Sequence, residues 1–371
     1  MKKLAFLTLA FMTLLMVACG SKTAYTIEGH VSDKAFFNQK VYLIDADGKT
    51  TLDSTTITDQ GIFLLNGKAD TMRMTTLQTF TGQYSGQAAY YGMLVLEPGR
   101  IYIDLVNDSL SGTPLNDKLS AYRYSKDMKA SERTIRDLAS QMQNLTDERA
   151  QAALLLRYDS LENVLVKKII ESTEKLYQEN ADNILGAYAL NVLAEYKHFN
   201  FATLDSIMKK SNPSIAQYAP NRDMLEHLHL VEKTSAGHPY INIEGTLHPS
   251  KDRSSLSQLI NGKVAILDFW ASWCGPCRKE IQENLIPLYH KYQKKGLVVV
   301  GVDMSDTEQG LAAAVKQLGI PYPILVADGN PGEIYGIVSI PQIILVGADG
   351  VIIARDLRGE AIENAVEEAL K

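Results

Sequence analysis

The sequence lacks the features that would place it at once in several large classes of protein. Its net charge is only −6 over 371 residues, which gives no reason to expect nucleic-acid binding. The apolar stretch at residues 4–17 is too short for a transmembrane helix, which needs about 20 residues. A composition of 46% hydrophobic and 22% charged residues excludes wholesale disorder, and the length suggests two to three domains. Cysteine is also scarce, with only three in the chain.

Two of the cysteines, Cys274 and Cys277, lie where a strand is expected to pass into a helix. The apolar run at residues 264–267 predicts a buried strand just before them. Cys274 is therefore expected near the helix N-terminus, with Cys277 about one turn along on the same face. The apolar residues that follow at helical spacing are Ile281, Leu285, Leu288 and Tyr292.

This placement favours redox chemistry. The thiolate is the reactive form of cysteine, and the unpaired N–H groups at a helix start, with the positive end of the macrodipole, lower the pKa of a thiol there. Gly275 keeps the turn tight, and Pro276 is tolerated because its missing N–H would be unpaired anyway. Cys274 would then attack a target disulfide, and Cys277 would displace the product from the mixed disulfide. A zinc site is the competing interpretation, but it needs four ligands and a second cysteine pair is absent.

The segment Trp273–Cys277, with Asp268 six residues before Cys274, resembles the thioredoxin active site. The wider stretch 262–350 resembles the TlpA/ResA-like branch of thioredoxin-fold proteins, which are membrane-tethered and extracytoplasmic. The resemblance implies an α/β thioredoxin fold for residues 235–371. It also implies a thiol–disulfide oxidoreductase whose activity rests on the cysteine pair.

Asp268 is expected on a strand that is buried on both faces, where loss of solvation raises the pKa of a carboxyl group. Such a group could take the proton from Cys277 through a water molecule. The alternative is an aspartate at the strand end that is satisfied by local backbone groups. Trp273 is expected to be partly exposed, to shield Cys274 and to contact the partner, whereas Trp270 is expected in the core.

The dipeptide Ile340-Pro341 is a second element of the predicted site. Proline removes a ladder donor, so it is expected at the first residue of the apolar strand that follows. By the resemblance this is the cis-proline loop that packs against the cysteine pair, and it leaves the backbone of Ile340 to pair with an extended substrate peptide. Gln342 stands where proteins of the resembled family commonly have threonine after this proline. On the cysteine helix, Arg278 and Lys279 are expected to be solvated. The predicted substrate-contacting residues are Trp273, Gly275, Pro276, Ile340 and Pro341, beside the catalytic residues Cys274, Cys277 and Asp268.

The N-terminal residues predict export. A Met-Lys-Lys opening is followed by the apolar stretch, and residues 16–21 resemble the lipobox of bacterial lipoproteins. The resemblance implies a signal peptide at residues 1–18, lipid attachment at Cys19 and a tether at residues 19–24. The chain would then be anchored by lipid on the periplasmic side of a bacterial membrane, and its redox function would rest on the one remaining cysteine pair. The alternative is an ordinary secretory signal with an incidental cysteine.

Residues 25–112 are predicted to form a β-rich domain. Strand patterns separated by turn signals, with no helical pattern between them, favour an antiparallel sandwich or half-barrel. Residues 25–66 also resemble the small β-domain found ahead of the thioredoxin domain in such lipoproteins. The expected strands span residues 25–29, 40–44, 52–58, 62–65, 72–80, 93–96 and 101–105.

Residues 113–234 are predicted to form an α-helical domain of four or five helices. His227 and His229 do not share a helix face, so they are expected to be surface or core residues rather than metal ligands. Residues 235–239 are the expected linker into the last domain. That domain should have strands at 240–243, 264–269, 297–302, 322–326, 342–346 and 351–355, and helices at 274–294, 307–318 and 360–370.

The leading functional hypothesis is an extracytoplasmic, lipid-anchored thiol–disulfide oxidoreductase. The Gly-Pro dipeptide and Ile340 resemble reducing thioredoxins, which favours reduction of disulfides in exported proteins. The implied partners are disulfide-bearing protein substrates, an upstream membrane electron donor and the membrane itself; no cofactor and no nucleic acid are expected. Two alternatives remain: a thiol peroxidase, and a partner-binding lipoprotein in which the redox domain is secondary.

Overall fold

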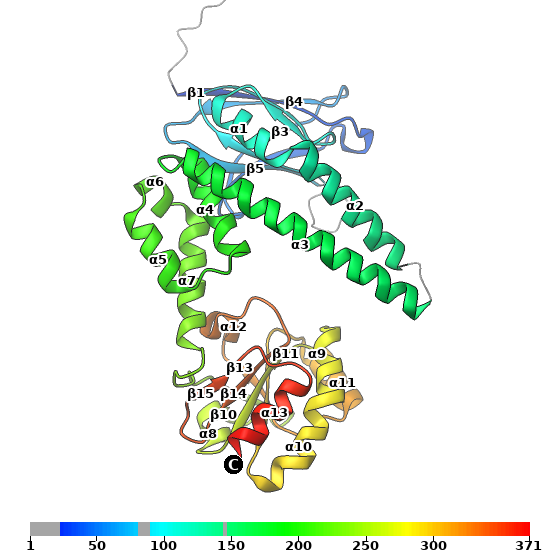
Figure 1. The fold of residues 1–371 in the computed structure, drawn as a ribbon. Coiled ribbons are helices and arrows are strands. Elements are labelled where there is room, and N and C mark those ends of the chain that lie inside the picture. Colours follow the sequence, from blue (N-terminus) through cyan, green and yellow to red (C-terminus); the bar gives the residue numbers. More distant parts are fainter. Residues whose placement is uncertain (1–22, 81–89, 144–146) are drawn as a thin grey trace, which may run out of the picture. The chain divides into compact units, whose positions relative to one another are not determined.

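The computed structural model describes residues 23–80, 90–143 and 147–371 (Figure 1). Contacts divide the chain into two compact units. One comprises the residues up to Phe199 together with Ile207–Arg222, and the other comprises Asn200–Ser206 and Asp223–Lys371. The predicted signal peptide and Cys19 lie outside the described residues. Within the described residues, no helix is both long and apolar enough to cross a membrane.

The first unit begins with two four-stranded sheets, in the orders β4-β1-β7-β8 and β3-β2-β5-β6. The expected short strands are present, but their pairing is not purely antiparallel, as a sandwich or half-barrel of that kind would require, because β1 pairs in parallel with β7. A whole second sheet separates these two strands in the sequence, so no local turn signals their pairing. The strands are β1 (Ala24–His30), β2 (Lys40–Asp45), β3 (Thr51–Thr56), β4 (Ile62–Lys68), β5 (Arg73–Thr79), β6 (Tyr90–Leu96), β7 (Gly99–Asp104) and β8 (Ser109–Ser111).

Most of the predicted helical region follows in the same unit, with seven helices in its described residues where four or five were expected. The carboxylate of Glu97 accepts hydrogen bonds from the backbone N–H groups of Leu115 and Asn116, and so caps the first helix at its positive end. The two longest helices, α2 and α3, run side by side (Figure 1). The helices are α1 (Pro114–Arg123), α2 (Lys126–Gln143), α3 (Glu148–Glu179), α4 (Ile184–Tyr196), α5 (Phe201–Lys210), α6 (Pro213–Ala216) and α7 (Ala219–Lys233), of which α5 and α7 cross between the units.

The second unit is built on a seven-stranded sheet in the order β10-β9-β13-β12-β11-β14-β15. The central strand β11 pairs in parallel with β12 and antiparallel with β14. The strands are β9 (Glu244–His248), β10 (Arg253–Ser255), β11 (Ala265–Trp270), β12 (Val298–Asp303), β13 (Ile324–Ala327), β14 (Gln342–Val346) and β15 (Ile352–Ala354).

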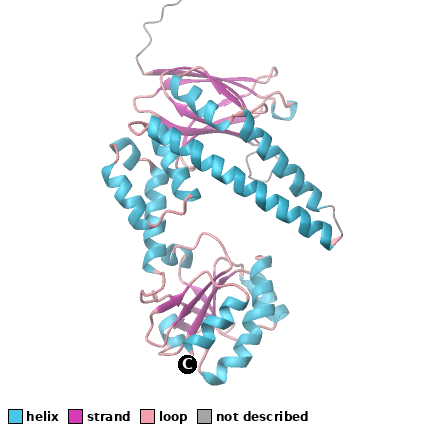
Figure 2. Ribbon diagram, in the orientation of Figure 1, coloured by secondary structure: helices cyan, strands magenta, loops and turns pink. Residues whose placement is uncertain are grey.

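Helices cover both faces of this sheet (Figure 2). Alternate residues of β11 point to opposite faces, as the strand period requires. Ile266 and Trp270 pack under α9, α10, α11 and α13, whereas Leu267 and Phe269 pack under α8 and α12. The helices are α8 (Leu256–Ile260), α9 (Gly275–Glu280), α10 (Ile286–Tyr292), α11 (Glu308–Leu318), α12 (Pro331–Tyr335) and α13 (Glu360–Ala369).

Three predictions for this unit need correction. Residues 240–243 are not a strand, because Ile241 exchanges its backbone hydrogen bonds with the Tyr335 hydroxyl instead of with a neighbouring strand. The supposed linker at residues 235–239 is bonded to the sheet, with the Gly237 N–H donating to the Ile352 carbonyl over 2.8 Å. The helix expected at 274–294 is interrupted by a π-helical turn at Ile281–Leu285, where Pro287 has no N–H to offer the preceding turn.

Candidate active site

The cysteine pair lies where β11 gives way to α9, as the sequence predicts. Cys274 is the N-cap of α9, and its sulfur accepts a hydrogen bond from the Cys277 N–H over 3.1 Å. The two sulfurs are joined in a disulfide, so the structure represents the oxidised form. Cys274 is 5% exposed and Cys277 is fully buried. Solvent therefore reaches Cys274 alone, which fits the order of attack expected for the pair.

The turn before Cys274 is held from outside by polar contacts. The Ser272 backbone N–H and hydroxyl both donate to the Asp306 carboxylate. Arg278 donates to the Ser272 carbonyl over 3.2 Å and to the Gln317 side chain over 2.8 Å. The expectation that Arg278 is merely solvated is therefore wrong, because its long side chain reaches back over the turn and tethers it to α11.

The two tryptophans occupy different environments, as expected. Trp273 is 65% exposed beside Cys274, whereas Trp270 is fully buried. The Trp270 indole lies over Gly301 on β12, where an added Cβ would come within 3.0 Å of the indole nitrogen and 2.4 Å of the Ile324 side chain. The absence of a side chain at Gly301 therefore makes room for the indole beneath the active-site turn.

Asp268 is buried on β11, on the face between Ile266 and Trp270. Neither carboxylate oxygen has a hydrogen-bond partner within the described residues, so local backbone groups do not satisfy it. Burial is the main cause that raises the pKa of Asp268 to about 8; the charge of Glu280 acts in the same direction, and the charge of Arg358 opposes both. The sequence predicts that burial raises the pKa of Asp268, and this prediction is confirmed.

Glu280 and Arg358 are two neighbours of Asp268 that sequence reasoning missed. The Glu280 carboxylate accepts hydrogen bonds of 2.8 Å from the Asn284 side chain and from the Gly359 N–H. Its position three residues after Cys277, on the same helix face, is a signal that could have identified it. Arg358 has no such signal, because it reaches the site from the loop before α13.

The Ile340–Pro341 bond is cis, as the resemblance implies, and β14 begins at the next residue. The backbone of Ile340 therefore lies outside the ladder that pairs β14 with β11. Gln342 is buried, and its side-chain nitrogen has no partner within the described residues. A second cis bond, between His248 and Pro249, was not expected.

A cavity of about 790 Å³ opens beside the cysteine pair. Trp273 from the turn and Ile340 from the proline loop both line it, and Val338 on its rim is 82% exposed. None of its lining residues is charged. Its lining residues are Trp273, Met304, Ser305, Gly329, Asn330, Ile337, Val338, Ser339 and Ile340.

A second cavity of about 380 Å³ shares Asn330, Ile337 and Val338 with the first. It is bounded on one side by α7, which brings His227 to its wall. Burial lowers the pKa of His227, and the charge of Arg355 adds to this effect. His229 stacks on Phe201 instead, with ring centroids 4.7 Å apart.

Nowhere in the described part of the chain do three or more His, Cys, Asp or Glu side chains gather where they could hold a metal ion.

Comparison with known proteins finds sequence relatives of the second unit. A model of the AhpC/TSA family matches residues 236–355. ResA of Bacillus thuringiensis, a thiol–disulfide oxidoreductase, is 35% identical over 113 residues. The C-terminal domain is therefore similar in sequence to ResA-like thiol–disulfide oxidoreductases. This agrees with the predicted thioredoxin fold and with the observed α/β architecture.

Further relatives carry related names. HelX of Rhodobacter capsulatus, a thiol:disulfide interchange protein, is 34% identical over 31% of this chain and 62% of its own length. The match to ResA covers 30% of this chain and 63% of ResA. The chain therefore spans less than two thirds of these relatives. A crystal structure of the thioredoxin domain of a Bacteroides vulgatus thiol-disulfide oxidoreductase covers 37% of this chain and 99% of its own, with 29% identity and a TM-score of 0.35.

The β-rich part of the first unit matches a different model. Residues 25–119 match a domain of unknown function, DUF4369. The chain is thus multidomain, with a β-rich region and a helical region ahead of the ResA-like domain, as the sequence predicts.

Proposed function

We propose that this protein reduces disulfides in exported proteins, outside the cytoplasm and anchored to a membrane through lipid on Cys19. One observation carries the proposal. A solvent-accessible Cys274 at a helix N-terminus is bonded to a buried Cys277, and a buried carboxyl group, Asp268, lies on the strand that leads into the pair. The names of the relatives support the same reaction class.

In the reduced protein the first step is attack by the Cys274 thiolate on a substrate disulfide. A bond forms between the Cys274 sulfur and one substrate sulfur, and the other substrate sulfur leaves as a thiolate that takes a proton from water. The helix N-terminus supports the attacking anion, because the N–H of Cys277 already points at the Cys274 sulfur.

In the second step Cys277 attacks the Cys274 sulfur and releases the second substrate sulfur as a thiolate, which takes a proton from water. Cys277 must first lose its proton, and Asp268 in its ionised form is the acceptor that we assign to this proton. The protein ends as the Cys274–Cys277 disulfide seen in the structure, and the substrate has gained two electrons and two protons. A dithiol donor at the membrane must then reduce the pair for another turnover.

The cavity beside the pair is the proposed binding site for the substrate. Trp273 and Val338 offer exposed apolar surface, and the free backbone of Ile340 can pair with an extended peptide. A folded partner would have to present its disulfide on an extended segment. Since no charged residue lines the cavity, we expect uncharged residues next to the reacting cysteine.

Peroxide reduction is the second reaction class to consider, because the matched family model is that of AhpC/TSA. A thiol peroxidase needs a lone peroxidatic cysteine. Here Cys274 is bonded to a cysteine one helical turn away, which favours disulfide exchange.

The test is reduction of insulin disulfides by the full chain, with the Cys274→Ser and Cys277→Ser variants and a hydroperoxide as a second substrate. We expect turnover to vanish in Cys274→Ser, and Cys277→Ser to trap a mixed disulfide with insulin. Hydroperoxide consumption without insulin reduction would replace the proposal with a peroxidase. A Cys274 that does not react with alkylating agents near neutral pH would refute both.

A further inference from the structure

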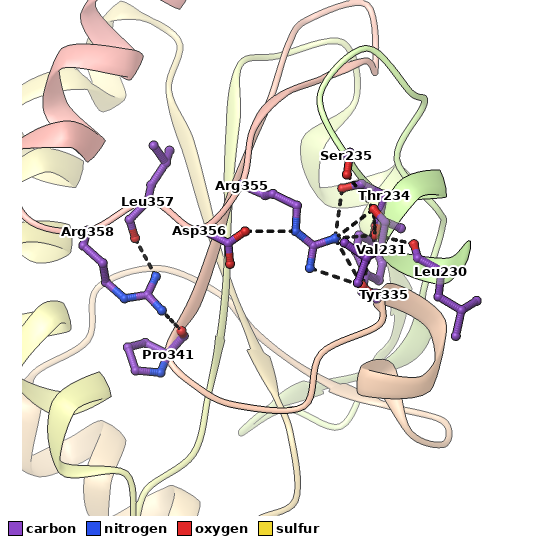
Figure 3. A network of polar contacts seen from close by, with 10 residues as sticks. All are labelled: Leu230, Val231, Thr234, Ser235, Tyr335, Pro341, Arg355, Asp356, Leu357 and Arg358. Atoms are coloured by element: carbon purple, nitrogen blue, oxygen red, sulfur yellow. Dashed lines mark hydrogen bonds and ion pairs between the residues drawn. The ribbon is translucent and has the colours of Figure 1, made fainter. Parts of the chain in front are cut away.

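The loop between β15 and α13, residues 355–359, contacts the active site at two points that are far apart in the sequence. Arg358 donates through one guanidinium nitrogen to the carbonyl of Pro341, in the proline loop (Figure 3). The next residue, Gly359, donates its N–H to the Glu280 carboxylate on α9 over 2.8 Å. The Leu357 N–H also bonds to the Ile343 carbonyl on β14 over 3.3 Å. This loop therefore joins the proline loop to the helix that carries the cysteines.

Arg358 holds its place through two hydrogen bonds that use different nitrogens of the same planar group. Its second nitrogen donates to the Leu357 carbonyl over 2.7 Å, so the guanidinium cannot rotate freely about the Pro341 contact (Figure 3). A guanidinium keeps its charge at every pH at which a protein is folded. The site thus has a fixed positive charge at its edge.

The groups that face Asp268 explain what this charge does. Glu280 presents a second acid from α9, and Tyr322 presents a buried phenol whose pKa is raised by burial and by the charge of Asp268. The charge of Glu280 disfavours an ionised Asp268, as does the burial of Asp268 without hydrogen-bond partners, whereas the neutral Tyr322 adds no charge. Arg358 is the charge that acts in the opposite direction.

We propose that Arg358 is a positioning residue of the reduction reaction, which holds the proline loop through the Pro341 carbonyl and supplies the positive charge that lets Asp268 ionise. This inference rests on the proposed function, because it assigns Asp268 to the step in which Cys277 loses its proton. Arg358 touches neither cysteine nor substrate in this assignment, so it acts through Asp268 and Pro341.

The effect can be estimated from the charge alone. A neighbouring opposite charge commonly shifts the pKa of a carboxyl group by about one unit or more. The pKa of Asp268 is about 8, so below that pH each unit of further increase lowers its ionised fraction about tenfold. Removal of the charge should therefore slow the second step about tenfold at pH 7 and leave the first step unchanged.

The experiment separates the two steps with dithiobis-nitrobenzoate, which releases one coloured thiolate when Cys274 attacks and another when Cys277 resolves the adduct. The reduced full chain is mixed rapidly with the reagent between about pH 6 and pH 10. For Arg358→Met we expect the midpoint of the second phase to move up by about one pH unit, with the first phase unchanged. Arg358→Lys, which keeps the charge, should retain the wild-type midpoint.

Lys279→Met is the matched control, since Lys279 is an exposed cation on the cysteine helix whose ammonium lies 3.9 Å from Glu283. It should leave both phases as they are. The charge role is overturned if Arg358→Met keeps the wild-type midpoint, if Arg358→Lys moves it as far as Arg358→Met, or if Lys279→Met moves it equally.

A separate measurement, the KM for insulin, tests whether Arg358 holds the proline loop. Insulin offers a peptide backbone to the proline loop, whereas the small reagent does not. Both Arg358 variants should therefore raise the KM for insulin several-fold, and an unchanged KM in both would refute this half of the inference. A wild-type protein that resolves the small adduct but does not reduce insulin would refute the proposed function alone and leave the charge test valid.

Discussion

Replacing Asp268 with asparagine should stabilise the C-terminal domain at neutral pH while it impairs the second step. The pKa of this buried group is about 8, against 3.8 in the absence of the fold. Between these pH values the folded protein holds a proton that the unfolded chain has released, so the free energy of unfolding falls as the pH rises. Each pKa unit is worth about 1.36 kcal/mol, which sets an upper limit of roughly 4 kcal/mol at pH 7.

The expected gain for Asp268→Asn is therefore about 2–4 kcal/mol at pH 7, about 1 kcal/mol more at pH 9, and close to zero at pH 4, because the neutral amide resembles the protonated acid. Urea unfolding of the oxidised protein, followed by tryptophan fluorescence, measures it. The only two tryptophans, Trp270 and Trp273, are both in the second unit, so the signal reports on this domain.

Asp252→Asn, at an exposed carboxylate of the same domain, is the control and should show no comparable dependence on pH. An Asp268→Asn gain that is the same at pH 4 and pH 9, or a loss of stability at pH 9, would contradict the reasoning. The variant should also resolve the nitrobenzoate adduct slowly, with no midpoint near pH 8 in the second phase.

Two further predictions concern the packing around the site, and the same fluorescence assay measures both. Gly301→Ala should cost about 1–3 kcal/mol, because its Cβ would meet the Ile324 side chain at 2.4 Å, whereas Gly275→Ala meets nothing within 4 Å and should cost less than about 1 kcal/mol; equal costs would refute the packing argument. Arg355→Met should cost about 2–4 kcal/mol, because it removes a partly buried guanidinium that donates to the Thr234 hydroxyl and to three backbone carbonyls. An unaltered midpoint would show that these contacts add nothing to stability.

The cysteine pair, Asp268 and Pro341 could be predicted because each carries a local signal. A strand that passes into a helix places Cys274 at the helix start, and a carboxylate in an apolar run implies burial. A proline that enters an apolar strand is expected at its first residue, and Pro341 lies one residue before β14 begins. All of these patterns lie within single continuous stretches of the chain. The positions of these residues in the fold are therefore largely readable from short stretches of the chain.

The contacts that Glu280 and Arg358 make around the site could not be predicted, because they join segments that are distant in the sequence. The bond from Gly359 to Glu280 spans 79 residues, and no periodicity links the two. The misplaced strand at residues 240–243 has a similar cause. Its neighbour β9 contains Gly245, and glycine is unfavourable in strands. Glycine is nevertheless required here, because an added Cβ would lie 2.2 Å from the Val326 carbonyl oxygen. Close approach to β13 thus determines the strand, and local propensity does not reveal it.

The domain boundary that the sequence predicts between residues 234 and 235 lies inside the second unit. Thr234, at the end of α7, is fully buried and donates its hydroxyl to the Tyr335 carbonyl over 3.0 Å. Arg355 binds both residues (Figure 3), and the Tyr335 ring packs on Phe269 with centroids 4.9 Å apart. Phe269 is the residue after Asp268 on the strand that leads to the cysteines. The helix before the domain is therefore bonded into the core beneath the active site, and the end of α7 is a structural part of the redox domain.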